Sequence, residues 1–182
     1  MRVSEKSLEL NLAAEILNRL RARPGMSKLY LRGLTQGEES RMGADFFAQL
    51  DGRTRLFAFQ FKAPLGRTDS TPYKFTLQRE QHTKLRVLST RSNNPVFYVL
   101  PFYATHQKLR KDIPNLIQDT WALRVKPMKI RDVFGTNRTK RISCNRGTAT
   151  VNPDYELIPF EKLALSLEDG VSPTDFSEWY ST

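Results

Sequence analysis

The segment from Met42 to Pro64, M-G-A-D-F-F-A-Q-L-D-G-R-T-R-L-F-A-F-Q-F-K-A-P, constrains the fold more than any other part of the chain. Its alternation of apolar residues on both sides of Asp51-Gly52 predicts a β-hairpin. The loop can hold two residues (Asp51 and Gly52) or four (Asp51 to Thr54), and either even length gives the same faces. One face is entirely apolar and carries Ala44, Phe46, Ala48, Phe57, Phe59 and Phe61. The other face collects Asp45, Gln60 and Lys62 beside Phe47, Leu56 and Ala58.

The polar group on this hairpin has two interpretations. With a four-residue loop Asp45 lies opposite Gln60, and with a two-residue loop the two are diagonal neighbours. In a metal-dependent phosphodiester site, Asp45 supplies an anionic oxygen for Mg2+, and the Gln60 side chain and Phe61 main chain supply neutral carbonyl oxygens. Lys62 then orients the water or steadies the charge on the phosphate. The alternative is an ordinary half-exposed hairpin whose polar residues face water.

The N-terminal segment is predicted to form a helix with Ser4 as its N-cap and Glu5 in its first turn. Helical spacing gathers one broad apolar face around Glu9, made of Leu8, Leu10, Leu12, Ala13, Ile16, Leu17 and Leu20. Asn11, Glu15 and Asn18 are expected outside this face. A buried carboxylate is costly unless it is paired or binds a metal. A helix packed on the polar face of the hairpin would therefore present Glu9 to the metal site. The alternative is an ion pair between Glu9 and Lys62 with no catalytic role.

A helix with a Glu, a strand ending at an Asp, a hairpin return carrying Q-x-K and then a helix together resemble the PD-(D/E)XK nuclease superfamily, over about the first hundred residues. The core of that superfamily is an α-β-β-β-α-β arrangement. The resemblance implies an α/β fold with a restriction-endonuclease-like core, a mixed central β-sheet flanked by α-helices. It implies Mg2+ or Mn2+ as cofactor, with Asp45 as the motif Asp, Gln60 in the (D/E) place, Lys62 as the motif Lys and Glu9 as the accessory acid. Asp45, Gln60, Phe61 and Glu9 would then be the metal ligands. Gln60 removes one negative charge from this set, which Glu9 can restore.

A further helix is expected from Thr76 to about Ser89. The resemblance implies that Gln78 or Gln81 on this helix reaches the water or the phosphate at the metal. The other elements expected from the sequence are a strand or turn at Ser27–Leu34, a loop at Thr35–Arg41, a buried strand at Pro95–Pro101 beside residues 55–62, a helix at Thr105–Asp112 with a helical turn to Asp119, strands at Trp121–Val125, Lys129–Val133 and Thr148–Val151, and a helix at Phe160–Leu167.

The distribution of charge divides the chain into two parts. The net charge is +10, yet residues 152–182 contain seven acids and one base, so residues 1–151 carry 28 bases against 12 acids. We therefore expect one domain, with a basic nuclease-like core at residues 1–151 and an acidic segment at 152–182 packed on it or extending from it. The basic surplus favours DNA as the partner; the alternative is a basic protein without a polyanionic partner. The acidic segment ends with Phe176, Trp179 and Tyr180, which could dock on the basic core, bind a protein partner or compete with DNA.

Two groups of basic residues are the candidate phosphate contacts. Arg67 and Lys74 follow the hairpin in a polar segment. The sequence between Gly135 and Gly147 is typical of a mobile surface loop that grips phosphates or enters a groove, with Arg138, Lys140, Arg141 and Arg146 as its contacts. The alternative is a charged loop that only faces solvent. Cys144, the single cysteine, falls in this loop and excludes an intramolecular disulfide.

The expected function is that of a Mg/Mn-dependent deoxyribonuclease, by analogy an endonuclease, in which a homodimer could address both DNA strands. The alternatives are a nucleic-acid-binding module, with Gln60 marking lost chemistry, and a subunit of a larger DNA repair or defence complex. The chain has no run of eighteen apolar residues and no N-terminal charged-then-apolar leader. These features predict a cytoplasmic protein that does not enter a membrane.

Overall fold

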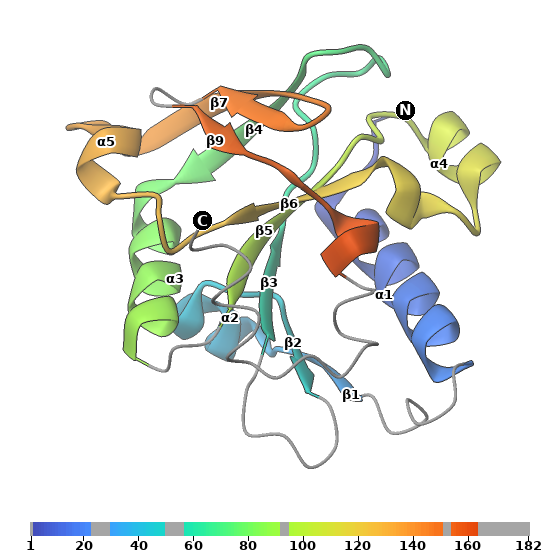
Figure 1. Ribbon diagram of the computed structural model, residues 1–182, viewed down its shortest axis with the longest axis horizontal. Helices are drawn as coiled ribbons and strands as arrows, with labels where there is room; N and C mark the ends of the chain where they lie inside the picture. The colour runs from blue at the N-terminus through green and yellow to red at the C-terminus, as the bar shows by residue number, and fades with distance from the viewer. Residues whose placement is uncertain (1, 23–29, 50–56, 92–94, 151–153, 164–182) are drawn as a thin grey trace.

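A computed structural model describes residues 2–22, 30–49, 57–91, 95–150 and 154–163 of the chain (Figure 1). The helices are α1 (Glu5–Arg21), α2 (Gln36–Met42), α3 (Arg79–Arg91), α4 (His106–Asp112), the short 3-10 helix η1 (Leu116–Asp119) and α5 (Ile130–Phe134). The strands are β1 (Tyr30–Gly33), β2 (Phe46–Gln49), β3 (Phe57–Phe61), β4 (Tyr73–Gln78), β5 (Val96–Pro101), β6 (Thr120–Arg124), β7 (Thr139–Asn145), β8 (Thr148–Thr150), β9 (Tyr155–Glu156) and β10 (Ile158–Pro159).

The strands form two sheets. The central sheet has six strands in the order β1-β2-β3-β5-β6-β10, in which β3 and β5 are parallel and the other neighbours are antiparallel. A smaller antiparallel sheet has the order β4-β7-β8-β9. Helix α1 covers one side of the central sheet, and α3 lies on the other (Figure 1). The expectation of an α/β fold with a mixed central sheet flanked by helices is confirmed.

The hairpin of β2 and β3 has one of the two predicted registers. Phe46 pairs with Phe59, Phe47 with Ala58, and Ala48 with Phe57. This is the register of the four-residue loop, in which Asp45 lies opposite Gln60. The loop itself, residues 50–56, lies outside the described residues. The predicted buried strand beside the hairpin is also confirmed, since β5 is buried throughout and pairs with β3.

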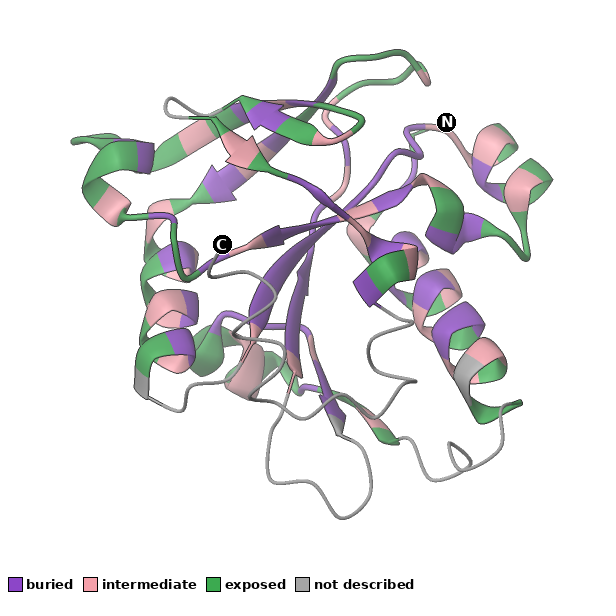
Figure 2. Cartoon of the chain, in the orientation of Figure 1, coloured by how far each residue is buried: buried purple, intermediate pink, exposed green. Residues whose placement is uncertain are grey.

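Two apolar clusters fill the space on either side of the central sheet (Figure 2). One joins Leu8, Leu12 and Ile16 of α1 to Phe59, Phe61 and Phe97 of the sheet. The other joins Phe47, Ala58 and Tyr98 of the sheet to Leu85 of α3 and to Phe75 and Ile142 of the small sheet. Burying one Leu or Phe side chain contributes about 1.5–3 kcal/mol, so α1 docks where the large aromatic side chains are.

Two expectations about the faces of the hairpin are therefore wrong. Helix α1 packs on the aromatic face, not on the face that carries Asp45, Gln60 and Lys62. Ala44 lies in the cluster on the opposite side, with Phe47. The chain bends at Asp45 before β2 begins, so the strict alternation of the strand does not extend back to Ala44.

Helix α1 begins as predicted but buries a narrower stripe. The Ser7 amide N–H donates to Ser4 Oγ at 3.0 Å, which confirms the N-cap. Leu10, expected in the apolar face, is 57% exposed. At about 100° per residue Leu10 lies nearly opposite Leu8 and Leu12 around the helix, and the sheet can cover only one side.

Glu15, expected outside the apolar face, is buried and has a structural role. Its carboxylate accepts the amide N–H groups of Leu116 at 2.7 Å and Ile117 at 3.4 Å. Burial raises the pKa of Glu15, while these two N–H groups and Arg19 oppose the rise. Glu15 thus caps the first turn of η1 and ties it to α1.

Several local elements also differ from prediction. Thr35–Arg41 is not a loop: Gln36 to Arg41 belong to α2, which Thr35 caps through a capping box with Glu38. Thr76 does not cap a helix because it lies in β4, and the helix starts at Arg79. Residues 130–133 are helical in α5, with Lys129 at its N-cap, instead of forming a strand. The expected loop between Gly135 and Gly147 contains strand β7, where burial raises the pKa of Cys144 to about 12.

Other predicted elements are confirmed. They are the helix capped by Thr105, the helical turn that ends at Asp119, and the strands that contain Tyr30, Trp121 and Thr148. Part of the acidic segment belongs to the same fold, since β9 pairs in the small sheet and β10 in the central sheet. Residues 160–163 are helical, and residues 164–182, with the three aromatic residues of the tail, lie outside the described residues. Within the described part of the chain, no helix is both long and apolar enough to cross a membrane.

Candidate functional site

The polar residues of the hairpin meet where β3 ends, beside the bend before β2 and the first turn of α1. Gln60 is 1% exposed, Lys62 7% and Asp45 9%. The interpretation of an ordinary half-exposed hairpin does not hold, because water reaches almost none of these side chains. Buried polar groups of this kind require partners.

Asp45 is held by two donors. Its Oδ2 accepts the Phe61 amide N–H at 2.7 Å and a Gln60 Nε2–H at 2.8 Å. Burial raises the pKa of Asp45 to about 7, against the opposing effects of the Phe61 N–H and the Lys62 charge. Glu5 and Glu9 raise this pKa further by repulsion. Near neutral pH, Asp45 therefore exchanges a proton easily, and a cation would compete with that proton.

The Gln60 amide nitrogen occupies the point where three oxygens converge. Nε2 lies 2.8 Å from Asp45 Oδ2, 3.0 Å from the Phe61 main-chain oxygen and 3.5 Å from Glu5 Oε1. The oxygen of the same amide, Oε1, is buried and has no hydrogen-bond partner among the described residues. An unpaired buried acceptor costs about 1–3 kcal/mol, which marks this amide as unsatisfied in its present orientation.

Lys62 pairs with Glu5, not with Glu9. Lys62 Nζ lies 3.1 Å from Glu5 Oε1, and Glu5 also accepts the Ala63 N–H at 3.4 Å. Glu9 is buried, as predicted, but its carboxylate bonds to Lys6. The alternative of an ion pair between Glu9 and Lys62 is therefore wrong.

Glu5 is the member of the site that the sequence did not reveal. Around the helix it lies at about 60° from Leu8, between Leu12 and Ile16, which places it at the centre of the face that α1 buries. The broad stripe assumed from the sequence put Glu9 at the centre instead. Giving more weight to the four-residue spacing of Leu8, Leu12 and Ile16 would have selected Glu5.

The two candidate accessory glutamines lie in different places. Gln78 ends β4 and is exposed, on a cavity of about 560 Å³ that Arg138 also lines. Gln81 lies beside the segment that leads to Asp45: a Cβ at Gly43 would lie 2.9 Å from its carbonyl oxygen and 3.4 Å from its Cγ. Gln81 Oε1 is buried and unpartnered among the described residues. Of the two, Gln81 is the one placed near the site.

The oxygens around Gln60 Nε2 match the ligand preference of a hard cation. Carboxylate, amide and main-chain carbonyl oxygens suit Mg2+ and Mn2+, and Mg2+ commonly takes only one or two carboxylates. In the described residues no three His, Cys, Asp or Glu side chains converge as one ligand group. A cation here would depend on the amide and main-chain oxygens as well as on Asp45 and Glu5.

The basic residues predicted to contact phosphate lie at several places, and the four expected in one loop belong to or flank strand β7. Lys74 and Arg141 line one cavity of about 550 Å³, and Arg67 is exposed in the loop beside it. Arg146 pairs with Asp119 at 3.1 Å. Lys140 lies on the same side of β7 as the buried Ile142, away from Arg141. The remaining residue, Arg138, precedes β7 at the second cavity.

The raised pKa of Asp45 predicts how stability depends on pH. The unfolded chain loses the proton of Asp45 near pH 4, whereas the folded protein keeps it to about pH 7. The stabilisation from this proton is complete below pH 4 and is lost as pH rises through 7, with a slope of at most about 1.4 kcal/mol per pH unit. Urea unfolding in EDTA from pH 5 to 8 should show wild type losing stability relative to Asp45→Asn. Parallel curves for the two proteins would contradict the assignment.

The site thus combines a titrating carboxylate, a second carboxylate, the Phe61 main-chain oxygen, the Gln60 amide and a buried ammonium group within one shell of contacts. Such a set can hold a hard cation and offer positive charge to an anionic substrate. A scan against protein-family models and a search of curated proteins find no match to this sequence.

Proposed function

We propose that this protein is a Mg2+- or Mn2+-dependent nuclease that hydrolyses DNA phosphodiester bonds, built on a restriction-endonuclease-like core. The observation that carries the proposal is the convergence of Asp45 Oδ2, the Phe61 carbonyl and Glu5 Oε1 on one point, with Lys62 beside it. All three oxygens are ligands that these cations prefer. The ammonium group is where a phosphate held at that point would need positive charge.

The order of elements supports the proposed core. The superfamily arrangement α-β-β-β-α-β corresponds here to α1, β1, β2, β3, α3 and β5, with α2 and β4 inserted. The four strands of this set are neighbours in the order β1-β2-β3-β5. The candidate site lies at the carboxyl end of β3, beside the parallel strand β5.

Each residue has a definite task in this proposal. A bound Mg2+ or Mn2+ supplies positive charge that polarises the phosphate and activates water. Asp45 and Glu5 provide the negative charge that holds the ion, with the Phe61 carbonyl as a neutral ligand. Gln60 can join them only if its amide turns, so that the unpaired Oε1 replaces Nε2 at the point of convergence. Lys62, steadied by Glu5, stabilises the charge that develops on the phosphate.

DNA is the proposed substrate because residues 1–151 carry 28 bases against 12 acids. An endonuclease acting as a homodimer would let two sites address both strands. The acidic segment after residue 151 could then compete with DNA or bind a protein partner.

A second candidate function is nucleic-acid binding without cleavage. The observation that favours it is the orientation of Gln60, whose amide N–H groups already bond Asp45 and the Phe61 carbonyl without a cation. If the Gln60 amide keeps this orientation, its hydrogen bonds occupy the position where a cation would bind. The protein would then keep the fold and the basic surface and lack the chemistry, as a binding module or a subunit of a DNA repair or defence complex.

The test is cleavage of supercoiled plasmid, linear duplex and single strands, with Mg2+, Mn2+ or EDTA, by wild type and Asp45→Asn. We expect cutting that needs the metal and is lost in the variant, which keeps the shape of the side chain but not its charge. Mn2+ should also raise the melting temperature of wild type and not that of the variant. DNA binding that persists without cutting, indifferent to metal and to the variant, would establish the binding module instead.

A further inference from the structure

A cavity of about 550 Å³ opens between the loop at residues 64–72 and the strands β4 and β7. Its lining contains the polar side chains of Thr68, Ser70, Thr71, Tyr73, Lys74 and Arg141, together with Gly66. None of the described residues that line it is acidic. Hydroxyl groups and cationic side chains are donors that recur around phosphate groups in proteins.

The two cations come from neighbouring strands. Lys74 pairs with Ser143 and Arg141 with Thr76 in the register of β4 and β7, so Lys74 and Arg141 are diagonal neighbours. Both are exposed, on the outer side of the small sheet. Within the described residues neither side chain forms an ion pair, in contrast to Arg146, which is bonded to Asp119. Their charges are therefore available for an anion from outside.

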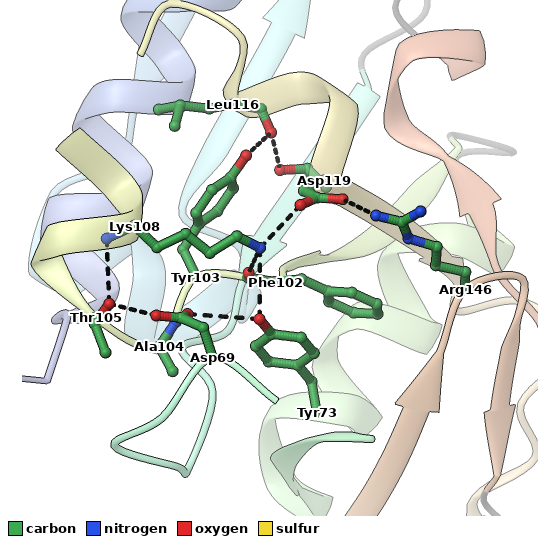
Figure 3. A network of polar contacts seen from close by, with 11 residues as sticks. Asp69, Tyr73, Phe102, Tyr103, Ala104, Thr105, Lys108, Leu116, Asp119 and Arg146 are labelled. Carbon is green, nitrogen blue, oxygen red and sulfur yellow. Dashed lines mark hydrogen bonds and ion pairs between the residues drawn. The ribbon is translucent and has the colours of Figure 1, made fainter. Parts of the chain in front are cut away.

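Hydrogen bonds hold the loop at residues 64–72, and with it the donor groups that line the cavity, in position. Its one acid, Asp69, is not among the residues that line the cavity, and it accepts the Ala104 N–H at 2.6 Å, the Thr105 hydroxyl and the Tyr73 hydroxyl at 3.5 Å (Figure 3). The Leu65 N–H donates to the Lys74 carbonyl at 2.7 Å and closes the base of the loop. The acid that would repel a phosphate is thus used to position the groups that would bind it.

The cavity begins next to the candidate site. Pro64, which contributes to its lining, is two residues after Lys62, so their Cα atoms are at most about 7 Å apart. The Pro64 carbonyl is itself held by Arg2 Nε at 3.1 Å. We propose that this cavity binds a backbone phosphate of the nucleic acid adjacent to the phosphate held at Lys62. This inference rests on the proposed function and adds the position and register of the bound strand.

The test measures DNA binding in EDTA, where no cutting occurs, by the anisotropy of a labelled oligonucleotide at several salt concentrations. The double variant Lys74→Gln/Arg141→Gln is compared with Arg110→Gln/Lys126→Gln, which removes two exposed cations elsewhere. We expect the cavity variant to bind roughly 10- to 100-fold more weakly and to reduce the salt slope by about one to two. The control should lose less than about threefold. Equal losses would show that only net charge matters and would overturn the inference.

Substitutions of Asp69 provide a second test, because the inference predicts a change in DNA affinity opposite to the one that net charge predicts. Asp69→Ala makes the protein more positive, so net charge alone predicts tighter DNA binding. If the fastened loop positions the phosphate, the variant should instead bind more weakly, whereas Asp69→Asn, which keeps an acceptor for the Ala104 N–H, should stay near wild type. Tighter binding by Asp69→Ala would contradict the inference.

A free phosphate is the other source of the same chemistry. If millimolar inorganic phosphate raises the melting temperature of wild type while the cavity variant binds DNA normally, the site belongs to a small phosphate compound and the inference fails. The outcomes also separate this inference from the proposed function. If the protein does not cut DNA but needs Lys74 and Arg141 to bind it, the phosphate-binding cavity is supported and the nuclease proposal is contradicted. If the protein cuts DNA but its DNA binding does not depend on these two residues, the nuclease proposal is supported and the cavity inference is contradicted.

Discussion

Gln60→Glu should make the stability of this protein depend on a divalent cation. The Gln60 amide donates to Asp45 Oδ2 and to the Phe61 carbonyl and lies near Glu5. An ionised glutamate at this position cannot donate and adds a third negative charge to a buried site. In EDTA at pH 8 we expect the free energy of unfolding to fall by roughly 3 kcal/mol. With Mn2+ the added carboxylate becomes a ligand, and at 100 times the dissociation constant the ion returns about 2.7 kcal/mol.

The measurement is urea unfolding with EDTA and with Mn2+. Two variants serve as controls. Gln60→Met removes the same hydrogen bonds without adding charge, so its loss should be the same with and without metal. Gln78→Glu adds the same charge at an exposed position and should stay within about 0.5 kcal/mol of wild type. A Gln60→Glu variant that ignores Mn2+ would show that the three converging oxygens do not hold a cation.

Lys62→Met should lower the rate of phosphodiester cleavage by about 10²- to 10³-fold, the usual loss when one group that stabilises a transition state is removed. Lys62 is 7% exposed and 3.1 Å from Glu5, so its charge acts where water screens little. Metal binding should change much less than the rate, because the ligands remain. Single-turnover cleavage and Mn2+ titration measure the two quantities separately. A parallel loss of both would show that Lys62 only supports the fold of the site.

The matched pair Glu5→Gln and Glu9→Gln decides which helix acid serves the site. Glu5 contacts Lys62 and approaches the Gln60 amide, whereas Glu9 bonds to Lys6. We expect Glu5→Gln to lose at least about tenfold in cleavage rate and Glu9→Gln to stay near wild type. The opposite ranking would restore Glu9 as the accessory acid that the resemblance implies.

Local sequence patterns were sufficient to predict the centre of the fold. The alternation on both sides of Asp51-Gly52 has a period of two, and that period decides which side chains share a face without reference to the rest of the chain. The same holds for β5, whose continuous apolar run can only be buried. The contact between Asp45 and Gln60 follows from that local register.

Sequence patterns did not predict strands β4 and β7, which form only where two segments distant in the chain pair with each other. The apolar positions Tyr73, Phe75 and Leu77 alternate with polar ones, and they become recognisable as a strand only when β7, more than sixty residues later, supplies Ile142 and Cys144 opposite them. Polar hydroxyl and basic residues between them gave the β7 segment the composition of a loop, and Thr76 to Gln78 of β4 were predicted as the start of a helix. The outer side of the same pairing creates the cavity of Lys74 and Arg141.

The sequence by itself determined the hairpin and the three polar residues that share one of its faces, and it left two registers open, of which the structure has the one that places Asp45 opposite Gln60. Only the tertiary structure decided which face α1 covers, because both faces of the hairpin carry apolar side chains, and the aromatic face offers more area to bury. That choice rotates α1 so that Glu5, not Glu9, reaches Lys62. The helix period was known from the sequence, but its phase against the sheet depends on packing between residues far apart in the chain.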